Sequence, residues 1–208
     1  MSPAQSKSML VYRQVKCGLR SGLYSPGQRI DPATLASQFD TSPTPVRMAL
    51  YRLLGEGLLA DHARDGLHVP MLNEFALSDL YDWMERLLLM ACDMDLAPVD
   101  HRRRISEMSV NGDPVKRTWQ LFDAIARATA HHSLQRAIRQ TNDQLAPIRR
   151  AKQDLLTQAR EELAPLLAYW QTSDIPALKS ALRSYHEYRK QVAPRIANLL
   201  SQRMDDFH

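Results

Sequence analysis

The chain has 208 residues, of which 44% are hydrophobic and 24% charged, a composition that excludes a disordered or low-complexity protein and predicts a buried core. Its net charge of +4, from 27 basic and 23 acidic residues, does not by itself indicate a nucleic-acid-binding protein. It has two cysteines, and its longest apolar run, Leu87 to Cys92, is far shorter than the roughly 20 residues of a membrane helix, so we expect a cytoplasmic protein without a disulfide framework, secretory signal or membrane span.

The positive charge is concentrated near the start of the chain. Residues 1–70 hold eight lysines and arginines against five acidic residues, which gives +3. The remaining 138 residues hold nineteen against eighteen, which gives +1. The small whole-chain charge therefore conceals a basic N-terminal segment.

The first segment predicts three successive helices. Apolar residues spaced by three and four predict a helix over residues 6–20. Asp31-Pro32 supplies an N-cap and a first-turn proline for a second helix. Thr41-Ser42-Pro43 begins a third helix, which is expected to end at Gly55 or Gly57.

A β-hairpin is predicted after the third helix. Short apolar runs over residues 58–61 and 67–69 flank Asp65-Gly66, a strong hairpin signal. A further extended piece is expected around Arg29 and Ile30. Three helices followed by a hairpin is the order of a winged helix-turn-helix, in which the third helix enters the DNA major groove.

The DNA-contacting residues follow from the chemistry that each part of such a module needs. Hydroxyl groups at the start of the third helix suit phosphates, a cation one turn later reaches base edges, a second cation meets the backbone, and the hairpin tip enters the minor groove. The candidates for phosphate contact are Thr41, Ser42 and Thr44. Arg47 is the candidate for base contact and Arg52 for contact with the DNA backbone. The candidates at the hairpin tip are Arg64, Gly66 and His68.

The remainder of the chain is predicted to be all-helical. Helical stripes of apolar residues recur from Leu77 to the end, and no strand is predicted. Asp174 is expected to cap the last helix, and Pro147 and Pro194 are expected to bend or interrupt theirs. The fold is therefore predicted to be mainly α, with a winged helix-turn-helix domain over residues 1–72 and a helical bundle over residues 73–208.

Several motifs of the first domain resemble the DNA-binding domain of GntR-type bacterial transcriptional regulators. The family pattern has a Pro-Gly turn, a Leu-Ala helix, a Ser-x-x-Pro-Val-Arg-x-Ala-Leu recognition helix, a Glu-Gly-Leu strand start and a Gly-x-x-Val wing. The matching segments are Gly22–Ile30, Leu35-Ala36, Thr41–Leu50, Leu53–Leu59 and Gly66–Val69. Pro43 and Met48 depart from the pattern, at positions where the family commonly has an arginine and an acidic residue.

The helical remainder resembles the effector-binding (FCD) domain of the FadR-like branch of that family. The resemblance rests on the Leu80-Tyr81-Asp82 opening and on the final helix from Asp174 to Leu200. It implies a homodimeric repressor or activator that binds palindromic, double-stranded operator DNA and responds to a small-molecule effector, expected to be a metabolite.

Many FCD domains hold a divalent metal, and we predict that this metal site is lost here, because the sequence departs from the family's ligands. The positions aligned with the metal ligands carry Trp119, Asp123, Leu163 and Tyr185, with His186 one residue away. We therefore expect no metal or other cofactor. A pocket anchored by Asp123 is expected instead, and the family usually has an arginine at one of its positions, Met84. The other residues expected at this pocket are Trp119, Leu163, Tyr185 and His186.

Two alternative functions remain open at this point. The bundle could serve only as a dimerisation device, or it could form a small acid–base enzyme. The sequence has no Ser/His/Asp set, Cys/His pair, Gly-rich phosphate loop or His-Glu-x-x-His motif for an enzyme.

Overall fold

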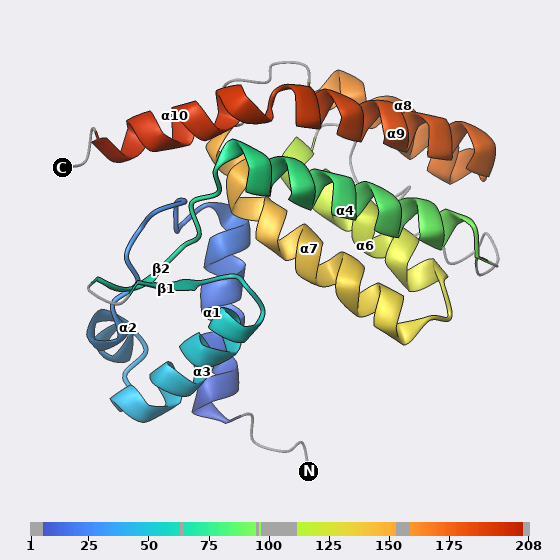
Figure 1. The fold of residues 1–208 in the computed structure, drawn as a ribbon. Helices are drawn as coiled ribbons and strands as arrows, with labels where there is room; N and C mark the ends of the chain where they lie inside the picture. The colour runs from blue at the N-terminus through green and yellow to red at the C-terminus, as the bar shows by residue number, and fades with distance from the viewer. Residues whose placement is uncertain (1–5, 63–64, 95, 97–111, 153–158, 206–208) are drawn as a thin grey trace, which may run out of the picture. The chain divides into compact units, whose positions relative to one another are not determined.

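The computed structural model describes residues 6–62, 65–94, 96, 112–152 and 159–205 (Figure 1). The chain forms two compact units. The first contains Met1–Met71 and Ala146–Ala151, and the second contains Leu72–Leu145 and Lys152–His208. None of the described helices is long and apolar enough to cross a membrane.

The first unit is a winged helix-turn-helix, which confirms the predicted fold. Its three helices precede a two-stranded antiparallel sheet (Figure 1). The elements are α1 (Lys7–Ser21), α2 (Pro32–Gln38), α3 (Pro43–Gly55), β1 (Ala60–His62) and β2 (Gly66–His68).

Local signals in the sequence set the ends of these helices. Asp31 caps α2, and its Oδ2 accepts a hydrogen bond from the Thr34 amide at 2.7 Å. Helix α1 ends at Ser21 and is capped by Gly22, whose φ of 84° lies in the left-handed region that favours glycine. Within α1, Gly18 permits a close contact, because a Cβ there would lie 2.5 Å from the Tyr24 ring.

The hairpin forms with a small shift from its predicted position. Strand β1 begins at Ala60 rather than at Leu58, because the Leu58 amide donates to the Leu53 carbonyl at the end of α3, at 2.9 Å. Ala60 pairs with His68, and the Asp65 amide donates to the His62 carbonyl at 3.0 Å, which closes the turn. The predicted extended piece also pairs with the hairpin, through an isolated bridge between Arg29 and His68.

Helix α3 is fixed by burial along one side only. Apolar side chains at helical spacing turn toward a core that α1, α2 and the hairpin complete. On α3 these side chains are Val46, Ala49, Leu50 and Leu53. The opposite side of α3 remains in solvent.

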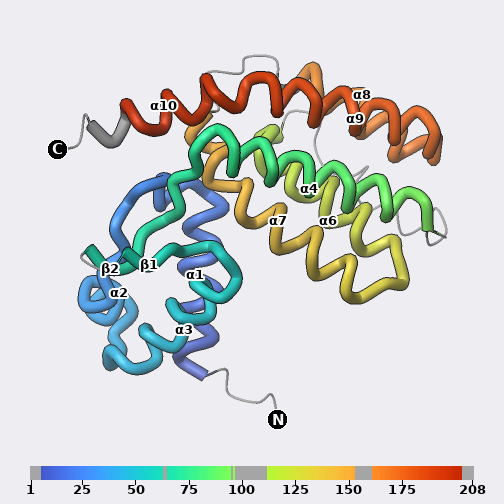
Figure 2. Tube along the Cα trace, in the orientation of Figure 1, coloured from blue at the N-terminus to red at the C-terminus, as the bar shows by residue number. Residues whose placement is uncertain are grey.

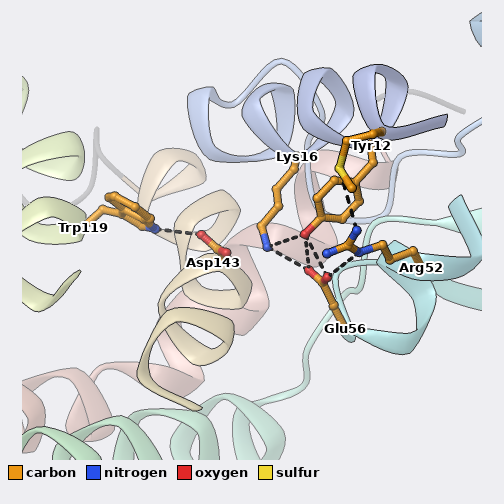
Figure 3. A network of polar contacts seen from close by, with 7 residues as sticks. Tyr12, Lys16, Arg52, Glu56, Trp119 and Asp143 are labelled. Atoms are coloured by element: carbon orange, nitrogen blue, oxygen red, sulfur yellow. Dashed lines mark hydrogen bonds and ion pairs between the residues drawn. The ribbon is translucent and has the colours of Figure 1, made fainter. Parts of the chain in front are cut away.

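A polar network also joins α1 to α3 (Figure 3). Glu56 lies just beyond the end of α3. Its Oε1 accepts a hydrogen bond from the Tyr12 hydroxyl at 2.8 Å, and its Oε2 lies 2.8 Å from Lys16 Nζ. Arg52 Nε lies 3.3 Å from Glu56 Oε1, and the Arg52 guanidinium carbon lies 4.0 Å from the centre of the Tyr12 ring. Glu56 therefore has three donors around one partly buried carboxylate.

The second unit is helical throughout its described residues, as predicted (Figure 2). Helix α4 packs against α6, α9 and α10, and α8 packs against α6 and α9. The elements are α4 (Glu74–Cys92), α6 (Pro114–Ala128), α7 (His132–Ala151), α8 (Ala159–Thr172), α9 (Ile175–Gln191) and α10 (Ala193–Asp205). The last six residues of α7 cluster with the first unit.

The two prolines singled out in the sequence behave differently. The expected last helix divides at Val192 into α9 and α10, which places Pro194 in the first turn of α10. Proline is tolerated there, because the first-turn amides have no partner within the helix. Pro147 instead lies inside α7, which continues to Ala151.

Replacing Glu56 with glutamine is expected to destabilise the first unit by about 1–3 kcal/mol at neutral pH, because the bonds from Lys16, Tyr12 and Arg52 lose their ionised acceptor. Hydrogen exchange of the α3 amides measures this free energy. Asp61→Asn is the control, since Asp61 is an exposed acid of the same unit. Equal α3 protection in both variants would contradict the assignment.

The loss of stability caused by Glu56→Gln should also depend on pH. Burial alone would raise the pKa of Glu56, but the hydrogen bonds from Lys16 and Tyr12 more than offset this and lower that pKa below its ordinary value of 4.5. The contribution of Glu56 to stability is therefore complete above pH 4.5 and is lost as the pH falls through the lowered pKa of the folded state. The wild type and Glu56→Gln should converge in acid.

Candidate DNA-binding surface and bundle interior

The solvent side of α3 carries a cation beside two large apolar side chains. Arg47 is exposed and has no ion pair with any residue that the structure describes. Next to it, Met48 is 61% exposed and Tyr51 62% exposed. Large apolar side chains at a continuous exposed site mark interaction surfaces rather than ordinary solvent-facing helix.

The start of α3 presents hydroxyl groups to solvent. Ser42 is the N-cap of α3, yet its side chain makes no capping hydrogen bond, and Thr44 is exposed one turn before Arg47. Thr41 differs from the expectation of a phosphate contact, because its Oγ1 is buried and has no hydrogen-bond partner within the described structure. The helix dipole is positive at this end, but Pro43 and Pro45 have no backbone N–H, so among the first three residues of α3 only Thr44 has an amide to offer a phosphate.

Arg52 lies in a different environment from the one expected. It was predicted to contact the DNA backbone, but its guanidinium stacks on Tyr12 and pairs with Glu56, and half of the side chain remains exposed. Its observed contacts therefore link α3 to α1.

The hairpin tip has a tight, open backbone. Gly66 is exposed with a φ of 77°, and a Cβ added to it would meet nothing within 4 Å. His68 Nδ1 lies 2.9 Å from the Gly66 carbonyl oxygen, and the ring packs edge-on against His62 at 5.1 Å between centroids. Arg64, the predicted cation of the wing, lies outside the described residues.

Sequence reasoning missed Tyr51 and His62 as members of this surface. Tyr51 is four residues after Arg47, so both fall on one side of α3, opposite the Val46 and Leu50 stripe. A helical projection of α3 contains this signal. His62 is exposed at the end of β1, one residue beyond the strand that the sequence predicted.

Two members of the predicted effector pocket lie deep in the bundle core. Met84 on α4 and Leu163 on α8 are almost fully buried. Trp119 on α6 is half-buried, and its Nε1 donates to Asp143 Oδ1 at 2.8 Å (Figure 3).

Asp123, the predicted polar anchor of the pocket, is held by two arginines. Its Oδ2 lies 2.7 Å from Arg127 Nε, and its Oδ1 lies 2.7 Å from Arg139 Nε. The Asp123 carboxylate is buried, whereas both arginines reach solvent. Both carboxylate oxygens thus already have charged partners within the bundle.

The remaining two pocket candidates form an aromatic cluster with Phe122. Tyr185 meets the Phe122 ring edge-on at 5.9 Å between centroids, and His186 stacks on Phe122 at 5.7 Å. His186 is almost fully buried, with Nδ1 2.8 Å from the Leu182 carbonyl oxygen.

An open groove of about 480 Å³ runs between α8 and α9. Its walls combine tyrosines with small and polar side chains. The lining residues are Glu162, Pro165, Tyr169, Ala177, Ser180, Ala181, Ser184, Tyr185 and Tyr188. Tyr185 is thus the one predicted pocket residue that lines this groove.

Arg189 lies against three residues of the groove wall. Its side chain is 3% exposed, and Nη2 pairs with Glu162 Oε2. The guanidinium carbon lies 4.2 Å from the centre of the Tyr185 ring and 5.5 Å from that of Tyr188. Nε and Nη1 are buried and have no hydrogen-bond partner among the described residues. Burial would lower the pKa of Arg189, but the electrostatic effect of the adjacent Tyr185 and the hydrogen-bonded ion pair with Glu162 raise it overall, so the guanidinium stays protonated.

The described residues contain no cluster of three or more histidine, cysteine, aspartate or glutamate side chains that could hold a metal ion. A protein metal site needs three or four converging donors. The loss of the metal site stays a prediction, which measurement of the bound metal tests.

The sequence of the first unit is similar to the sequences of transcriptional regulators. Residues 8–69 match the family model described as bacterial regulatory proteins, gntR family. The chain is 42% identical over 59 residues to the Nta operon transcriptional regulator of Aminobacter aminovorans, a match that covers 28% of each protein. It is 33% identical over 70 residues to YdhC of Bacillus subtilis, an uncharacterized HTH-type transcriptional regulator, covering 34% of this chain and 31% of that protein. The matched stretch thus spans less than a third of either relative.

Solved structures extend the similarity of fold to nearly the whole chain. E. coli McbR/YncC superposes with a TM-score of 0.69 at 22% identity, over 95% of this chain and 99% of that one. A putative GntR transcriptional regulator from Rhodococcus sp. RHA1 superposes with a TM-score of 0.76 at 14% identity, over 91% and 98%. At these identities the likeness concerns the fold.

The fold and the exposed face of α3 define the class as a winged helix-turn-helix protein with a helical C-terminal domain. Within that class, the first unit is similar to the gntR family of bacterial regulatory proteins, whose model matches residues 8–69. The relatives that match it are transcriptional regulators rather than enzymes.

Elemental analysis of untagged protein is expected to find far less than one zinc or nickel ion per chain. Trp119 and Leu163 stand at positions that the sequence resemblance aligns with metal ligands, and both Asp123 oxygens already contact arginines. The same analysis after incubation with Zn²⁺ and dialysis serves as the control for metal lost in purification. Stoichiometric metal that survives dialysis would contradict the expectation.

Proposed function

We propose that this protein is a sequence-specific, DNA-binding transcriptional regulator whose helical domain binds a small-molecule effector. The observation that carries the DNA-binding part is the two-sided character of α3. One side is buried through Val46 and Leu50, while the other exposes Arg47, Met48 and Tyr51. A helix held in this way offers a rigid surface to the major groove.

Each exposed group on α3 has a chemical counterpart on B-DNA. The Arg47 guanidinium matches guanine O6 and N7, the contact most often used for specificity. Met48 supplies an apolar surface for a thymine methyl group, and the Tyr51 hydroxyl suits a phosphate. Ser42 and Thr44 lie at the positive end of the helix dipole, where phosphates bind.

The hairpin would complete the interface in the minor groove. Gly66 lets the backbone approach the DNA closely, and His68 and Arg64 would supply polar and charged contacts. Two such modules in a cytoplasmic homodimer would bind a palindromic operator, because two-fold protein symmetry matches two-fold site symmetry. We propose repression as the mode of regulation; the family resemblance is compatible with repression and with activation.

Buried polar chemistry in the bundle supports the effector-binding part. A core that served only for dimerisation would be expected to be apolar, yet Arg189 is buried with two nitrogens that the described residues leave without acceptors. Lys152 is also buried, and its Nζ donates to the Tyr81 hydroxyl at 2.9 Å. A ligand with oxygen acceptors would satisfy Arg189, and the groove of about 480 Å³ beside Tyr185 and Glu162 has room for one.

Arg47→Ala is expected to weaken binding to the DNA upstream of the protein's own gene by about 1–3 kcal/mol and to relax its base preference. Gel-shift titration at several salt concentrations measures both affinity and salt slope. Arg13→Ala removes the same charge from an exposed position on α1 and is the matched control. Equal losses in the two variants, or wild-type affinity for Arg47→Ala, would contradict base reading by α3.

Thermal-shift screening with metabolites distinguishes a sensor from a bundle that only dimerises. A ligand that binds only the folded chain, at ten times its Kd, should raise Tm by about 3–5 °C. Arg189→Gln should abolish that rise, whereas Arg183→Gln, which changes an exposed arginine of the same helix, should leave it unchanged. If oxygen-bearing metabolites leave Tm unmoved, the dimerisation-only alternative is favoured.

A further inference from the structure

Helix α4 presents an exposed face that combines apolar and charged side chains. Phe75, Trp83 and Met90 are 72%, 49% and 48% exposed. At about 100° per residue, they fall within an arc of about 80°, which also contains Asp79 and Arg86. We call these five residues the α4 face. The opposite side of α4 packs inside its own bundle, against α6, α9 and α10.

The residues of the α4 face are placed so that the face is complementary to a second, antiparallel copy of itself. Phe75 and Met90 lie at equal distances from a midpoint between Asp82 and Trp83, and Asp79 and Arg86 lie at equal distances from the same midpoint. When a second copy of α4 lies antiparallel across this face, Phe75 meets Met90 and Asp79 meets Arg86. A two-fold axis beside Trp83 then repeats both contacts, as a symmetric dimer interface requires.

The charges select the antiparallel arrangement. Parallel pairing would place Asp79 against Asp79 and Arg86 against Arg86, which is unfavourable at an interface. Within one helix these two residues are about 10 Å apart along the axis and do not pair with each other. Arg86 instead bonds Asp82 through Nε at 2.6 Å, while the described residues offer Asp79 no ion-pair partner.

The spacing also suits helix packing. The five residues follow one another in steps of four, four, three and four, which is close to the 3.6-residue period of a straight stripe. The stripe from Phe75 to Met90 is about 22 Å long. Two such stripes remain in contact along their length when the helices cross at a shallow angle, as in antiparallel bundles.

We infer that the α4 face is the homodimer seam, and that its occupant is the α4 helix of a second copy in antiparallel orientation about a two-fold axis near Trp83. This inference rests on the homodimer of the proposed function and names the surface that forms it. It leaves α3 and the groove between α8 and α9 outside the seam, since neither contributes a residue to the α4 face.

A charge exchange tests the seam with the full-length chain. Light scattering coupled to gel filtration, over a dilution series, measures the dimer Kd. Asp79→Arg places an arginine opposite Arg86 and should weaken the dimer at least about tenfold. Asp79→Arg combined with Arg86→Asp should restore the Kd to within about threefold of wild type. Restoration must occur between copies, because the two residues are too far apart along one helix to pair.

Two further variants complete the test. Trp83→Glu should give monomers of 23.8 kDa that keep the wild-type circular dichroism spectrum. Arg183→Asp reverses an exposed charge on α9 and should leave the dimer intact. The inference is overturned by a monomeric wild type, by an Asp79→Arg dimer as tight as wild type, or by a double variant that fails to recover. Gel shifts on the same preparations separate these failures from a failure of DNA binding.

Discussion

The structure of the first unit depends on the one-sided burial of α3. Val46, Ala49, Leu50 and Leu53 fix the helix in the core, and the removal of these side chains from water is the main favourable contribution to its placement. Because the burial is confined to one stripe, the helix cannot rotate without exposing that stripe. Arg47 and its neighbours are therefore held outward in a fixed orientation, which is what base recognition requires.

The polar network around Glu56 reinforces the same constraint from the end of α3. The Glu56 carboxylate accepts from Tyr12 and Lys16 of α1, and Arg52 of α3 both pairs with it and stacks on Tyr12. A cation expected at the DNA backbone thus makes internal contacts that help set the angle between two helices. Charged residues near a recognition helix can have either role, and only their contacts distinguish the two.

Local features of the fold were predictable because short-range chemistry determines them. Asp31 with Pro32, and Asp65 with Gly66, mark helix starts and turns through backbone bonding within a few residues. The division of the expected last helix at Val192 depends on the position in which Pro194 is tolerated. The placement of Leu58 depends on its packing in the core of the first unit. Contacts between distant segments, such as Arg52 with Tyr12 and Asp123 with Arg139, have no local signal in a single sequence.

The central claim is that Arg47 on α3 reads a base in the major groove, and dimethyl sulfate protection of guanine N7 tests it most directly. With wild-type protein on its own upstream DNA, we expect protected guanines within the bound segment. With Arg47→Ala at a concentration that gives the same occupancy, protection should disappear at particular guanines and persist at the others. An unchanged protection pattern at equal occupancy would contradict the claim.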